Sequence, residues 1–362
     1  MEQGKCSLEN MEINFNFWKN KSVFITGHTG FKGGWLALWL SELGANVYGY
    51  SLKAPTDINF FKVINLKKKI KKSTIGDIRN LTGLQNSMCN ANPSIIFHMA
   101  AQSLVRQSYV DPLETFLTNL IGTINVFEAA RKIKSVKAIV NITTDKCYEN
   151  YETNKPYSET DRLGGLDPYS SSKACSEIAT SAYRSSFLNK SGIKIASARA
   201  GNVIGGGDWA NDRLIPDFFR SIDNNKILNI RSPKAVRPWQ HVLDPLSGYL
   251  MLAEKLVNEG DNFAEAWNFG PENTGTRTVS WILKRFSRKF KKAKFKINKQ
   301  KNYHESKLLN LNISKAKSKL GWKPVWSIES AIDNTIEWYE NYKRKENMME
   351  FSIKQIKAYQ SS

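Results

Sequence analysis

Short apolar runs alternate with longer amphipathic stretches through the first half of the chain. The runs occupy residues 23–26, 46–52, 94–102, 137–145 and a segment that starts at 194, and a helical pattern extends over 115–132. Strands that are apolar throughout are covered on both faces, and helices between them provide that cover. The pattern therefore predicts an α/β fold with a doubly wound parallel sheet.

The alternation ends near residue 205, where GGGDWANDRLIPD marks loops through its Gly, Asp and Pro residues. Shorter elements follow, and Ser327 precedes an acidic residue and a periodic helix. We predict a first domain over 18–201, with a helix near 243–257 packing back onto it, and a smaller α/β lobe over 202–344. Because no Pro- or Gly/Ser-rich linker separates them, the two should share a cleft.

Two terminal extensions complete the predicted organisation. Residues 1–17 form a polar leader, and 345–362 follow the last predicted helix. The stretch after Arg344 is polar, so we predict a mobile tail there.

The formal net charge is +20, from 53 Lys and Arg against 33 Asp and Glu. Such a balance also occurs in nucleic-acid-binding proteins. The lysines, however, gather at 67–72 and over 284–301, and lysine clusters of this kind are usually solvated faces. We therefore expect no nucleic-acid partner, although a basic surface helps to attract an anionic small molecule such as a nucleotide.

No apolar run approaches the ~18 residues of a membrane-spanning helix, and the leader lacks the apolar core of a signal peptide. The sequence therefore predicts a cytoplasmic protein without a membrane partner. Its four cysteines, Cys6, Cys89, Cys147 and Cys175, lie far apart and form no zinc-binding spacing. We interpret them as free thiols and expect no metal site.

The first candidate for chemistry is the glycine turn GHTGFKG, which joins the run 23–26 to an apolar-periodic helix. Gly27, Gly30 and Gly33 suit a backbone that turns sharply, approaches a pyrophosphate and packs a helix against a strand. The amide hydrogens and the dipole at the helix N-terminus would then bind the phosphates. The turn therefore predicts a dinucleotide site, and the alternative is a tight strand–helix turn without a ligand.

The residues alone leave the type of dinucleotide open. An acidic residue at the end of the second strand would bind the ribose 2′-hydroxyl of NAD, yet the run 46–52 is followed by Lys53. Lys53 could instead contact the 2′-phosphate of NADP. Asp77 and Ile78, in GDIRN after a predicted short strand, either border the adenine or form a surface turn.

The second candidate is a pair of side chains that suits proton transfer. Tyr169 and Lys173 are four positions apart, which places them on one face of a helix. A tyrosine pKa near ~10 is too high for a base at neutral pH, and a neighbouring ammonium favours the phenolate. Such a pair suits proton transfer with an alcohol as hydride leaves its carbon. The spacing is common on exposed helices, but here it follows a strand-like segment that ends in TTDK.

Several motifs occur together in a fixed order: GHTGFKG, FHMAAQ, TTDKCYEN, YSSSK, RAGNVIGGGDW, RPWQHV and LGWKP. They resemble the extended short-chain dehydrogenase/reductase family, and within it the nucleotide-sugar 4,6-dehydratases, over residues 18–342. The resemblance implies a Rossmann-like sheet domain, a second lobe that binds the substrate, and NAD in preference to NADP. It also implies a homodimer or homotetramer, paired through the helix 115–132 and the helix that carries Tyr169.

The residue after Asp145 indicates a branch of that family. In the dTDP-glucose and GDP-mannose dehydratases the triplet reads Thr-Asp-Glu, so Lys146 in place of Glu points to the branch that acts on CDP-glucose. Epimerases lack the acidic residue at the position of Asp145. The resemblance therefore implies a lyase that forms CDP-4-keto-6-deoxyglucose and water, a step of deoxysugar and lipopolysaccharide O-antigen biosynthesis.

The resemblance also implies a role for each residue of TTDK and YSSSK. Tyr169, aided by Lys173, would deprotonate the C4 hydroxyl while NAD accepts the C4 hydride, and Thr144 would bind the same oxygen. Asp145 would act as general acid on the C6 hydroxyl, and Lys146 could accept the C5 proton. Alternatively Lys146 only positions groups, and a water or Tyr169 takes that proton.

The remaining site residues follow from the same resemblance. The cofactor-binding positions would be Gly27, Gly30, Phe31, Gly33, Asp77, Ile78, Ala100, Ala101, Tyr169 and Lys173. The substrate-binding positions would be Arg106, Asn202, Arg213 and Arg237, where arginine suits a diphosphate; Arg213 could also be a surface loop residue. His98 and His241 have no second ligand nearby in sequence and are interpreted as structural.

Two alternatives to this function remain on sequence grounds. One is another nucleotide-sugar dehydratase that acts on a dTDP- or GDP-sugar. The other is a catalytically idle dinucleotide-binding protein, against which the complete set of Thr144, Asp145, Tyr169 and Lys173 argues.

Overall fold

The computed structural model describes residues 13–272, 275–290, 293–297 and 308–362. Cys6, most of the predicted extension 1–17 and the last residues of the lysine group 284–301 lie outside the described residues. Cys89, Cys147 and Cys175 are free thiols. None of the helices in the described part of the chain is both long enough and apolar enough to cross a membrane.

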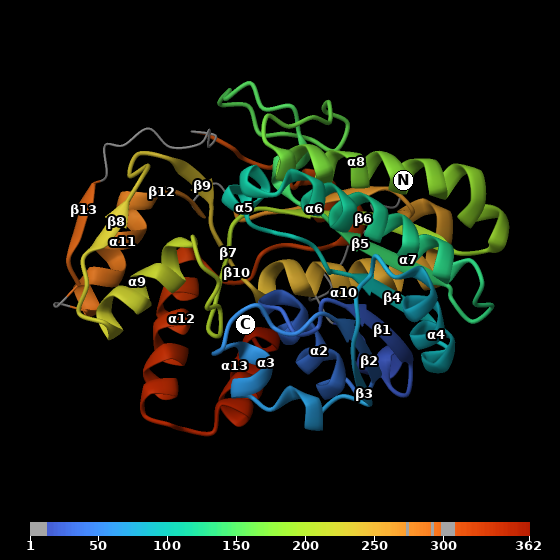
Figure 1. Cartoon of the computed structure of the whole chain (residues 1–362), viewed down its shortest axis with the longest axis horizontal. Coiled ribbons are helices and arrows are strands. Elements are labelled where there is room, and N and C mark those ends of the chain that lie inside the picture. The colour runs from blue at the N-terminus through green and yellow to red at the C-terminus, as the bar shows by residue number, and fades with distance from the viewer. Residues whose placement is uncertain (1–12, 273–274, 291–292, 298–307) are drawn as a thin grey trace, which may run out of the picture.

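A seven-stranded parallel sheet forms the first domain (Figure 1). Its strands are β1 (Ser22–Thr26), β2 (Asn46–Ser51), β3 (Lys72–Ile75), β4 (Ile95–His98), β5 (Ala138–Ile142), β6 (Lys194–Ala200) and β11 (Ala266–Phe269). The strand order is β11-β6-β5-β4-β1-β2-β3, so the sequence order reverses between β1 and β4. That is the arrangement of a Rossmann-like sheet, which binds its ligand at the carboxyl ends of the strands near the reversal.

Helices cover both faces of the sheet, as the fully buried strands β4 and β5 require. One face carries α2 (Phe31–Glu42) and α10 (Leu243–Glu259), and the other carries α4 (Leu81–Ala91), α7 (Gly122–Ala130) and α8 (Pro168–Tyr183). Shorter helices are α1 (Phe15–Trp18), α3 (Phe60–Val63), α5 (Val105–Val110) and α6 (Pro112–Phe116). The predicted helix 115–132 corresponds to α6, a π-helical turn over Leu117–Ile121, and α7.

The second lobe lies beside the carboxyl edge of the sheet (Figure 1). Its helices are α9 (Leu214–Asp223), α11 (Val279–Lys289) and α12 (Ile328–Lys343), and its strands are β7 (Val203–Ile204), β8 (Leu228–Ile230), β9 (Val236–Pro238), β10 (Gln240–His241), β12 (Thr276–Thr278) and β13 (Phe295–Ile297). The strands form the pairs β10-β7, β12-β9 and β13-β8. Aromatic side chains fill the core of this lobe, where the Phe219 and Tyr339 rings stack 3.8 Å apart.

The chain crosses between the two parts more than once. Strand β11 lies within the range 202–344 that the sequence assigns to the second lobe, yet it pairs with β6 at the end of the main sheet. The predicted helix 243–257 is α10, whose apolar residues pack against the sheet. The two parts are therefore connected by several crossings, which favours a fixed cleft between them.

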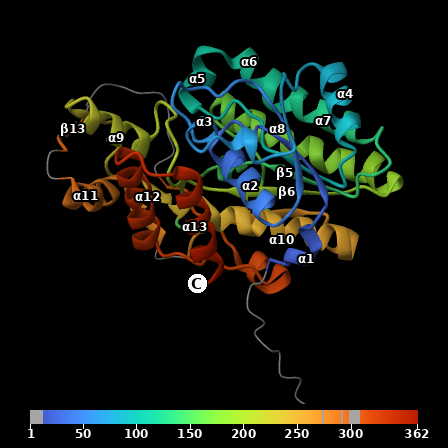
Figure 2. The same cartoon turned by 90° about the horizontal axis from the view of Figure 1, so that it is seen from below.

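The prediction of a mobile tail after Arg344 is wrong. Residues in this stretch form helix α13 (Met348–Gln360), which lies against α2 and α12 (Figure 2). Met348, Ile356 and Tyr359 bury their side chains there. Apolar residues at helical spacing pack one face of the segment, although its overall composition is polar.

Candidate active site

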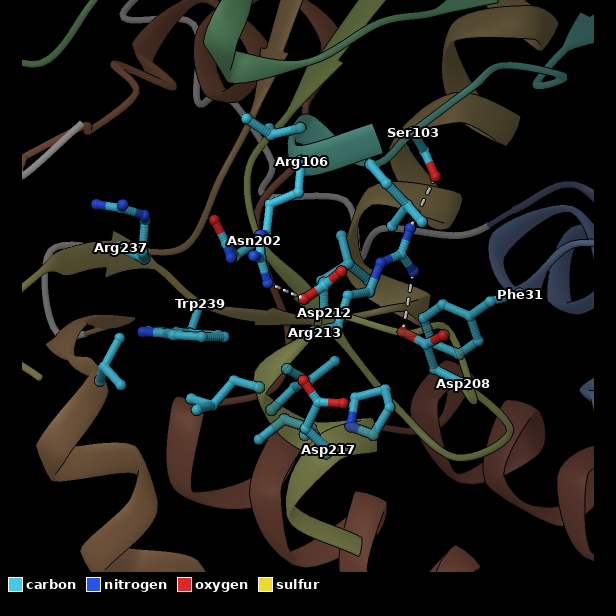
Figure 3. Close-up of a pocket in the computed structure, with 18 of the residues that line it drawn as sticks. Phe31, Ser103, Arg106, Asn202, Asp208, Asp212, Arg213, Asp217, Arg237 and Trp239 are labelled. Carbon is cyan, nitrogen blue, oxygen red and sulfur yellow. Dashed lines mark hydrogen bonds and ion pairs between the residues drawn. The ribbon is translucent and has the colours of Figure 1, made fainter. Parts of the chain in front are cut away.

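A cavity of about 870 Å³ lies between the carboxyl edge of the sheet and the second lobe (Figure 3). Its wall comes from the segment after β5, the start of α8, β7, α9, β8 and β9. Open α/β sheets bind their ligands at this edge. The cavity is therefore the candidate active site.

Thr144 organises the segment that follows β5. Its Oγ1 accepts a hydrogen bond from the Lys146 backbone nitrogen at 3.3 Å and donates to Asp145 Oδ1 at 3.1 Å. The Asp145 side chain is buried, and its Oδ2 has no hydrogen-bond partner among the described residues. A β-carbon at Gly201 would lie 3.0 Å from this oxygen. The glycine therefore allows the chain to pass close to a buried carboxylate oxygen whose hydrogen-bonding capacity is unused among the described residues.

Helix α8 begins immediately before the tyrosine of YSSSK. Asp167 caps the helix by accepting a hydrogen bond from the Ser170 backbone nitrogen at 2.9 Å. Tyr169 and Lys173 then lie on the face that lines the cavity, and Lys173 Nζ donates to the Ile142 carbonyl at 3.0 Å. The end of β5 and the start of α8 are thereby held together.

The charge state of this pair differs from the sequence-based expectation. Burial raises the pKa of Tyr169 to about 12, and a hydrogen bond with the Thr144 hydroxyl and the charge of Arg213 oppose that rise. Burial also lowers the pKa of Lys173 to about 8. The Lys173 ammonium donates its hydrogen bond to the Ile142 carbonyl. The pKa of Tyr169 rises because the loss of water around its phenol outweighs the effect of nearby cations.

Lys146 lies beside Asp145 in the 3₁₀ turn Asp145–Cys147, is half-buried, and lines the same cavity. The structure thus brings together all five residues that the sequence predicts to be catalytic: Thr144, Asp145, Lys146, Tyr169 and Lys173.

The glycine turn has the close backbone contacts of a dinucleotide site. Gly27 has φ +83°, and a β-carbon there would lie 2.8 Å from the backbone nitrogen of Ala100. A β-carbon on Gly33 would lie 2.2 Å from the Gly27 carbonyl oxygen. Gly30 is the N-cap of α2, so the first amides of this helix remain available. The turn therefore fits a pyrophosphate at the helix N-terminus.

Hydroxyl groups occupy the end of β2, at the position where a carboxylate would bind the ribose of NAD. Ser51 Oγ and Thr29 Oγ1 are 2.8 Å apart, and Thr29 donates to the Leu52 carbonyl at 2.9 Å. Lys53 is exposed. Sequence reasoning missed Thr29 and Ser51 because both are ordinary hydroxyl residues whose proximity depends on the pairing of β1 with β2.

The Asp77 side chain is held within its own turn. Its carboxylate accepts hydrogen bonds from the Arg79 guanidinium at 2.6 to 3.1 Å, and this interaction lowers the pKa of Asp77. Ile78 is buried, and a β-carbon on Gly122 would lie 2.5 Å from its Cδ1. The turn therefore has a fixed position at the edge of the sheet beyond β3.

Lys32 is a cavity residue that sequence reasoning missed, although it belongs to the glycine turn. It lines the cavity beside Phe31 and Ala101, and its Nζ donates to the Tyr249 hydroxyl at 2.9 Å. Burial and the charge of Lys173 lower the pKa of Lys32 to about 7. Its position in the glycine turn, directly after Phe31, was the sequence signal that could have placed Lys32 beside the ligand.

Arginines surround the middle of the cavity (Figure 3). Arg213 contacts Asp208 Oδ2 and Ser103 Oγ, each at 3.0 Å, and Arg106 contacts Asp212 Oδ1 at 2.8 Å. Arg213 thus lies in the cavity wall, rather than free on a surface loop. These guanidinium groups are held by carboxylates from the segment before α9.

Asn202, which directly precedes β7, and Arg237 of β9 line the cavity, together with the buried Trp239 (Figure 3). The Trp239 indole nitrogen donates to the Arg277 carbonyl at 3.0 Å. All four residues predicted to bind substrate, which are Arg106, Asn202, Arg213 and Arg237, therefore line one cavity.

A buried ion pair behind the cavity was also missed. The Arg199 guanidinium contacts Glu177 Oε2 at 2.9 Å, Ser197 Oγ donates to the same oxygen at 2.6 Å, and Thr143 donates to the other. The pair thereby fixes Thr143, the neighbour of Thr144. Because Glu177 and Arg199 belong to α8 and β6, only the fold brings them together.

His98 and His241 are fully buried, as expected of structural residues. His98 bonds to the hydroxyls of Thr26 and Thr123 at 2.7 and 2.9 Å, and burial lowers its pKa to about 3. Among the described residues there is no cluster of His, Cys, Asp and Glu that could hold a metal ion.

Residues 24–335 match the family model of GDP-mannose 4,6 dehydratase. The chain is 47% identical over 356 residues to the CDP-glucose 4,6-dehydratase of Salmonella typhimurium, which covers 97% of this chain and 99% of the relative. It is 25% identical over 283 residues to the dTDP-glucose 4,6-dehydratase of Haemophilus influenzae, and the match covers 73% of this chain and 81% of that relative.

Solved structures show the same fold. The dTDP-glucose 4,6-dehydratase of Bacillus anthracis in complex with NAD has a TM-score of 0.74 at 22% identity, covering 91% of this chain and 99% of that one. The epimerase Mth375 of Methanothermobacter thermautotrophicus has a TM-score of 0.78 at 23% identity, and the match covers 95% of this chain and 99% of that one.

Proposed function

The chain belongs to the GDP-mannose 4,6-dehydratase family of extended short-chain dehydrogenases/reductases, and on that premise we propose that it converts CDP-glucose to CDP-4-keto-6-deoxyglucose and water. The observation that carries this proposal is the 47% identity to a CDP-glucose 4,6-dehydratase over 97% of the chain. Thr144, Asp145, Tyr169 and Lys173 line one cavity beside the glycine turn, which supports a working site over an idle one.

We propose that the glycine turn holds NAD. When bound there, NAD accepts a hydride from C4 of the hexose and later returns it to C6, so its redox state does not change overall. Gly27, Gly30 and Gly33 would admit the pyrophosphate, and the hydroxyls of Thr29 and Ser51 would face the adenosine ribose. The Bacillus anthracis dehydratase that shares this fold was solved in complex with NAD, which favours NAD over NADP.

Tyr169 is the proposed base for the C4 hydroxyl. In the free protein burial raises the pKa of this phenol to about 12, so it requires help to lose its proton. The Arg213 charge and the Thr144 hydroxyl both favour the phenolate. Lys173 adds positive charge to the cavity and joins α8 to β5 through the Ile142 carbonyl. Thr144 also binds the C4 oxygen.

Elimination across C5 and C6 requires a second acid and a second base. Asp145, with its carboxyl group in the protonated form, would give that proton to the C6 hydroxyl, which leaves as water. Lys146, next to it in the cavity wall and with its amine in the neutral form, would accept the C5 proton. The alternative role for Lys146 is to position groups while a water or Tyr169 takes that proton.

The arginines are proposed to bind the diphosphate. Arg106, Arg213 and Arg237 reach the cavity from three different elements, and Asn202 lies among them (Figure 3). Guanidinium groups stay charged and donate in a fork that matches phosphate oxygens. They would hold the nucleotide while the hexose extends toward Tyr169.

We also propose that the protein pairs as a homodimer, or as a homotetramer built from two such dimers, through the helical segment 115–132, which includes α7, and through α8, which carries Tyr169. Leu113, Leu117 and Ile121 form one exposed apolar stripe, and Ile178 of α8 and Phe187 in the turn after α8 are also exposed. Burying these side chains against a second copy would remove them from water.

A panel of sugar nucleotides tests the proposed reaction. We expect the purified protein to form a 4-keto product from CDP-glucose, detected by its absorbance in alkali, with no consumption of added NAD. The matched Tyr169→Phe variant, which lacks only the hydroxyl, should form none. Product from a dTDP- or GDP-sugar but not from CDP-glucose would reassign the substrate, and product from none of them would favour an idle dinucleotide-binding protein.

A further inference from the structure

The cavity continues beyond the arginines, along α9 to β8. Asp217, Arg220, Ser221 and Asn224 line this far end, together with residues of the 226–232 segment. Tyr169 and Asp145 mark the opposite end, where the hexose would react. A diphosphate held near Arg213 therefore directs the base of the nucleotide toward the far end.

Helix α9 is strongly amphipathic. Phe218 and Phe219 pack into the core of the second lobe, whereas Asp217, Ser221 and Asn224 recur at helical spacing on the cavity side. The helix therefore presents a polar edge to whatever occupies the far end of the cavity.

Asp217 is oriented by contacts that use one of its two carboxylate oxygens. Arg220 donates to Oδ1, and the same guanidinium donates to the carbonyls of Trp209 and Ala210 at 2.7 and 3.0 Å. Arg220 is thereby fixed by three acceptors. In the described contacts of Asp217 the Oδ2 atom takes no part, so it can accept a hydrogen bond from a ligand in the cavity (Figure 3).

A carboxylate distinguishes pyrimidine bases by the group at their position 4. Cytosine has an amino group there, which donates, whereas thymine has a carbonyl oxygen, which accepts. Uracil has the same carbonyl as thymine. An ionised carboxylate only accepts hydrogen bonds, so it attracts the first base and repels the other two.

We propose that Asp217 selects the cytosine base of the substrate by accepting a hydrogen bond from its 4-amino group through Oδ2. This inference rests on the proposed function, because it assigns the base of the same sugar nucleotide. Asp217 acts on specificity and lies away from the reacting carbons, so it changes binding of the nucleotide more than the chemical step.

The Asp217→Asn variant tests this inference. Its amide can face the base with either a donor or an acceptor, so the discrimination should weaken. We expect the ratio of kcat/KM for CDP-glucose over UDP-glucose to fall about tenfold, mainly through KM for CDP-glucose, with kcat at saturation little changed. An unchanged ratio would overturn the assignment.

The matched control is Asp223→Asn at the end of the same helix. Asp223 accepts a hydrogen bond from the Tyr339 hydroxyl and lies 2.7 Å from Lys343, and it does not line the cavity. This variant should lose stability but keep the wild-type ratio. If both variants changed the ratio equally, the effect would come from the position of α9, and the role of Asp217 would be refuted.

Calorimetric titration with CDP and UDP separates this inference from the proposed function. If wild type prefers CDP and Asp217→Asn loses that preference, the base assignment stands even if CDP-glucose is not turned over. If wild type converts CDP-glucose and the variant keeps its preference for CDP, the reaction stands and the assignment fails. Equal wild-type affinity for CDP and UDP would also overturn the assignment.

Discussion

Lys32 carries an ammonium group into the first turn of α2, where the helix dipole is unfavourable to a cation. Burial and the neighbouring Lys173 lower the pKa of Lys32 to about 7. The unfolded chain therefore keeps this proton to a higher pH than the folded chain does. Burying the Lys32 ammonium lowers the free energy of unfolding by its full amount below about pH 7. This destabilisation decreases as the pH rises toward about 10.5, the ordinary lysine pKa.

We accordingly expect the free energy of unfolding of wild type to increase, relative to that of Lys32→Met, when the pH is raised from about 6 to about 9.5. Urea unfolding at the two pH values measures this difference. The exposed Lys53 supplies the control for replacing a lysine with methionine, and Lys53→Met should change the free energy of unfolding only slightly. A Lys32→Met difference that stays constant with pH would mean that the ammonium is well solvated in the cavity.

Lys146 is the residue on which the proposed elimination depends. If it accepts the C5 proton, Lys146→Met should lower kcat on CDP-glucose by about 10²- to 10⁴-fold, the usual contribution of a general base. Exchange of the C5 proton with deuterated solvent should fall by a similar factor. Unchanged activity of a Lys146→Glu variant would mean that the lysine is not essential to proton removal.

The residues of the site differ in how far sequence could predict them. Thr144, Asp145 and Tyr169 occur in short contiguous motifs, so their proximity was predictable. Glu177 and Arg199 meet only because β5 and β6 pair beside α8. The charge state of Tyr169 was misjudged for a related reason, since desolvation depends on how completely the fold surrounds a side chain.

Helix α13 shows how an element can be misread from composition. Its polar residues suggested a tail, but the Tyr359 ring packs 5.6 Å from Trp39 and 5.3 Å from Trp326. The Tyr359 hydroxyl also donates to Asp244 Oδ1 at 2.9 Å. The main strands, in contrast, were predicted correctly because a continuous apolar run is a local signal. The pairing of β11 with β6, however, joins residues far apart in the sequence, so no local pattern predicts it.

Removing the tyrosine ring tests the contribution of α13. Tyr359→Ala should lower the free energy of unfolding by about 3–5 kcal/mol, through the cavity it leaves and the hydrogen bond it removes. Chemical denaturation of the full chain measures the change. The exposed Lys357 on the same helix provides the control, and Lys357→Ala should have little effect. Equal stability of both variants would show that α13 contributes little to the folded state.

At the scale of the whole molecule, the distribution of exposed apolar side chains is uneven. Leu113 of α6 is 68% exposed and Ile178 of α8 is 57% exposed, and these two helices lie in contact with each other. Leu117 and Ile121 continue the stripe of Leu113 at four-residue spacing. A soluble monomer rarely leaves such a contiguous stripe in water, so the stripe favours association with a second copy.

The double variant Leu117→Glu, Ile178→Glu should therefore convert the protein to a monomer, because two carboxylates at the centre of the interface would each lose their water on pairing. Light scattering during gel filtration measures the mass. Ile75→Glu, which alters an exposed apolar residue at the end of β3 away from the stripe, should leave the mass of wild type unchanged. A wild-type protein that already has the monomer mass, or a double variant that keeps the dimer mass, would refute pairing through these helices. Activity of the monomeric variant would then show whether the cavity, whose described wall comes from one chain, works without a partner.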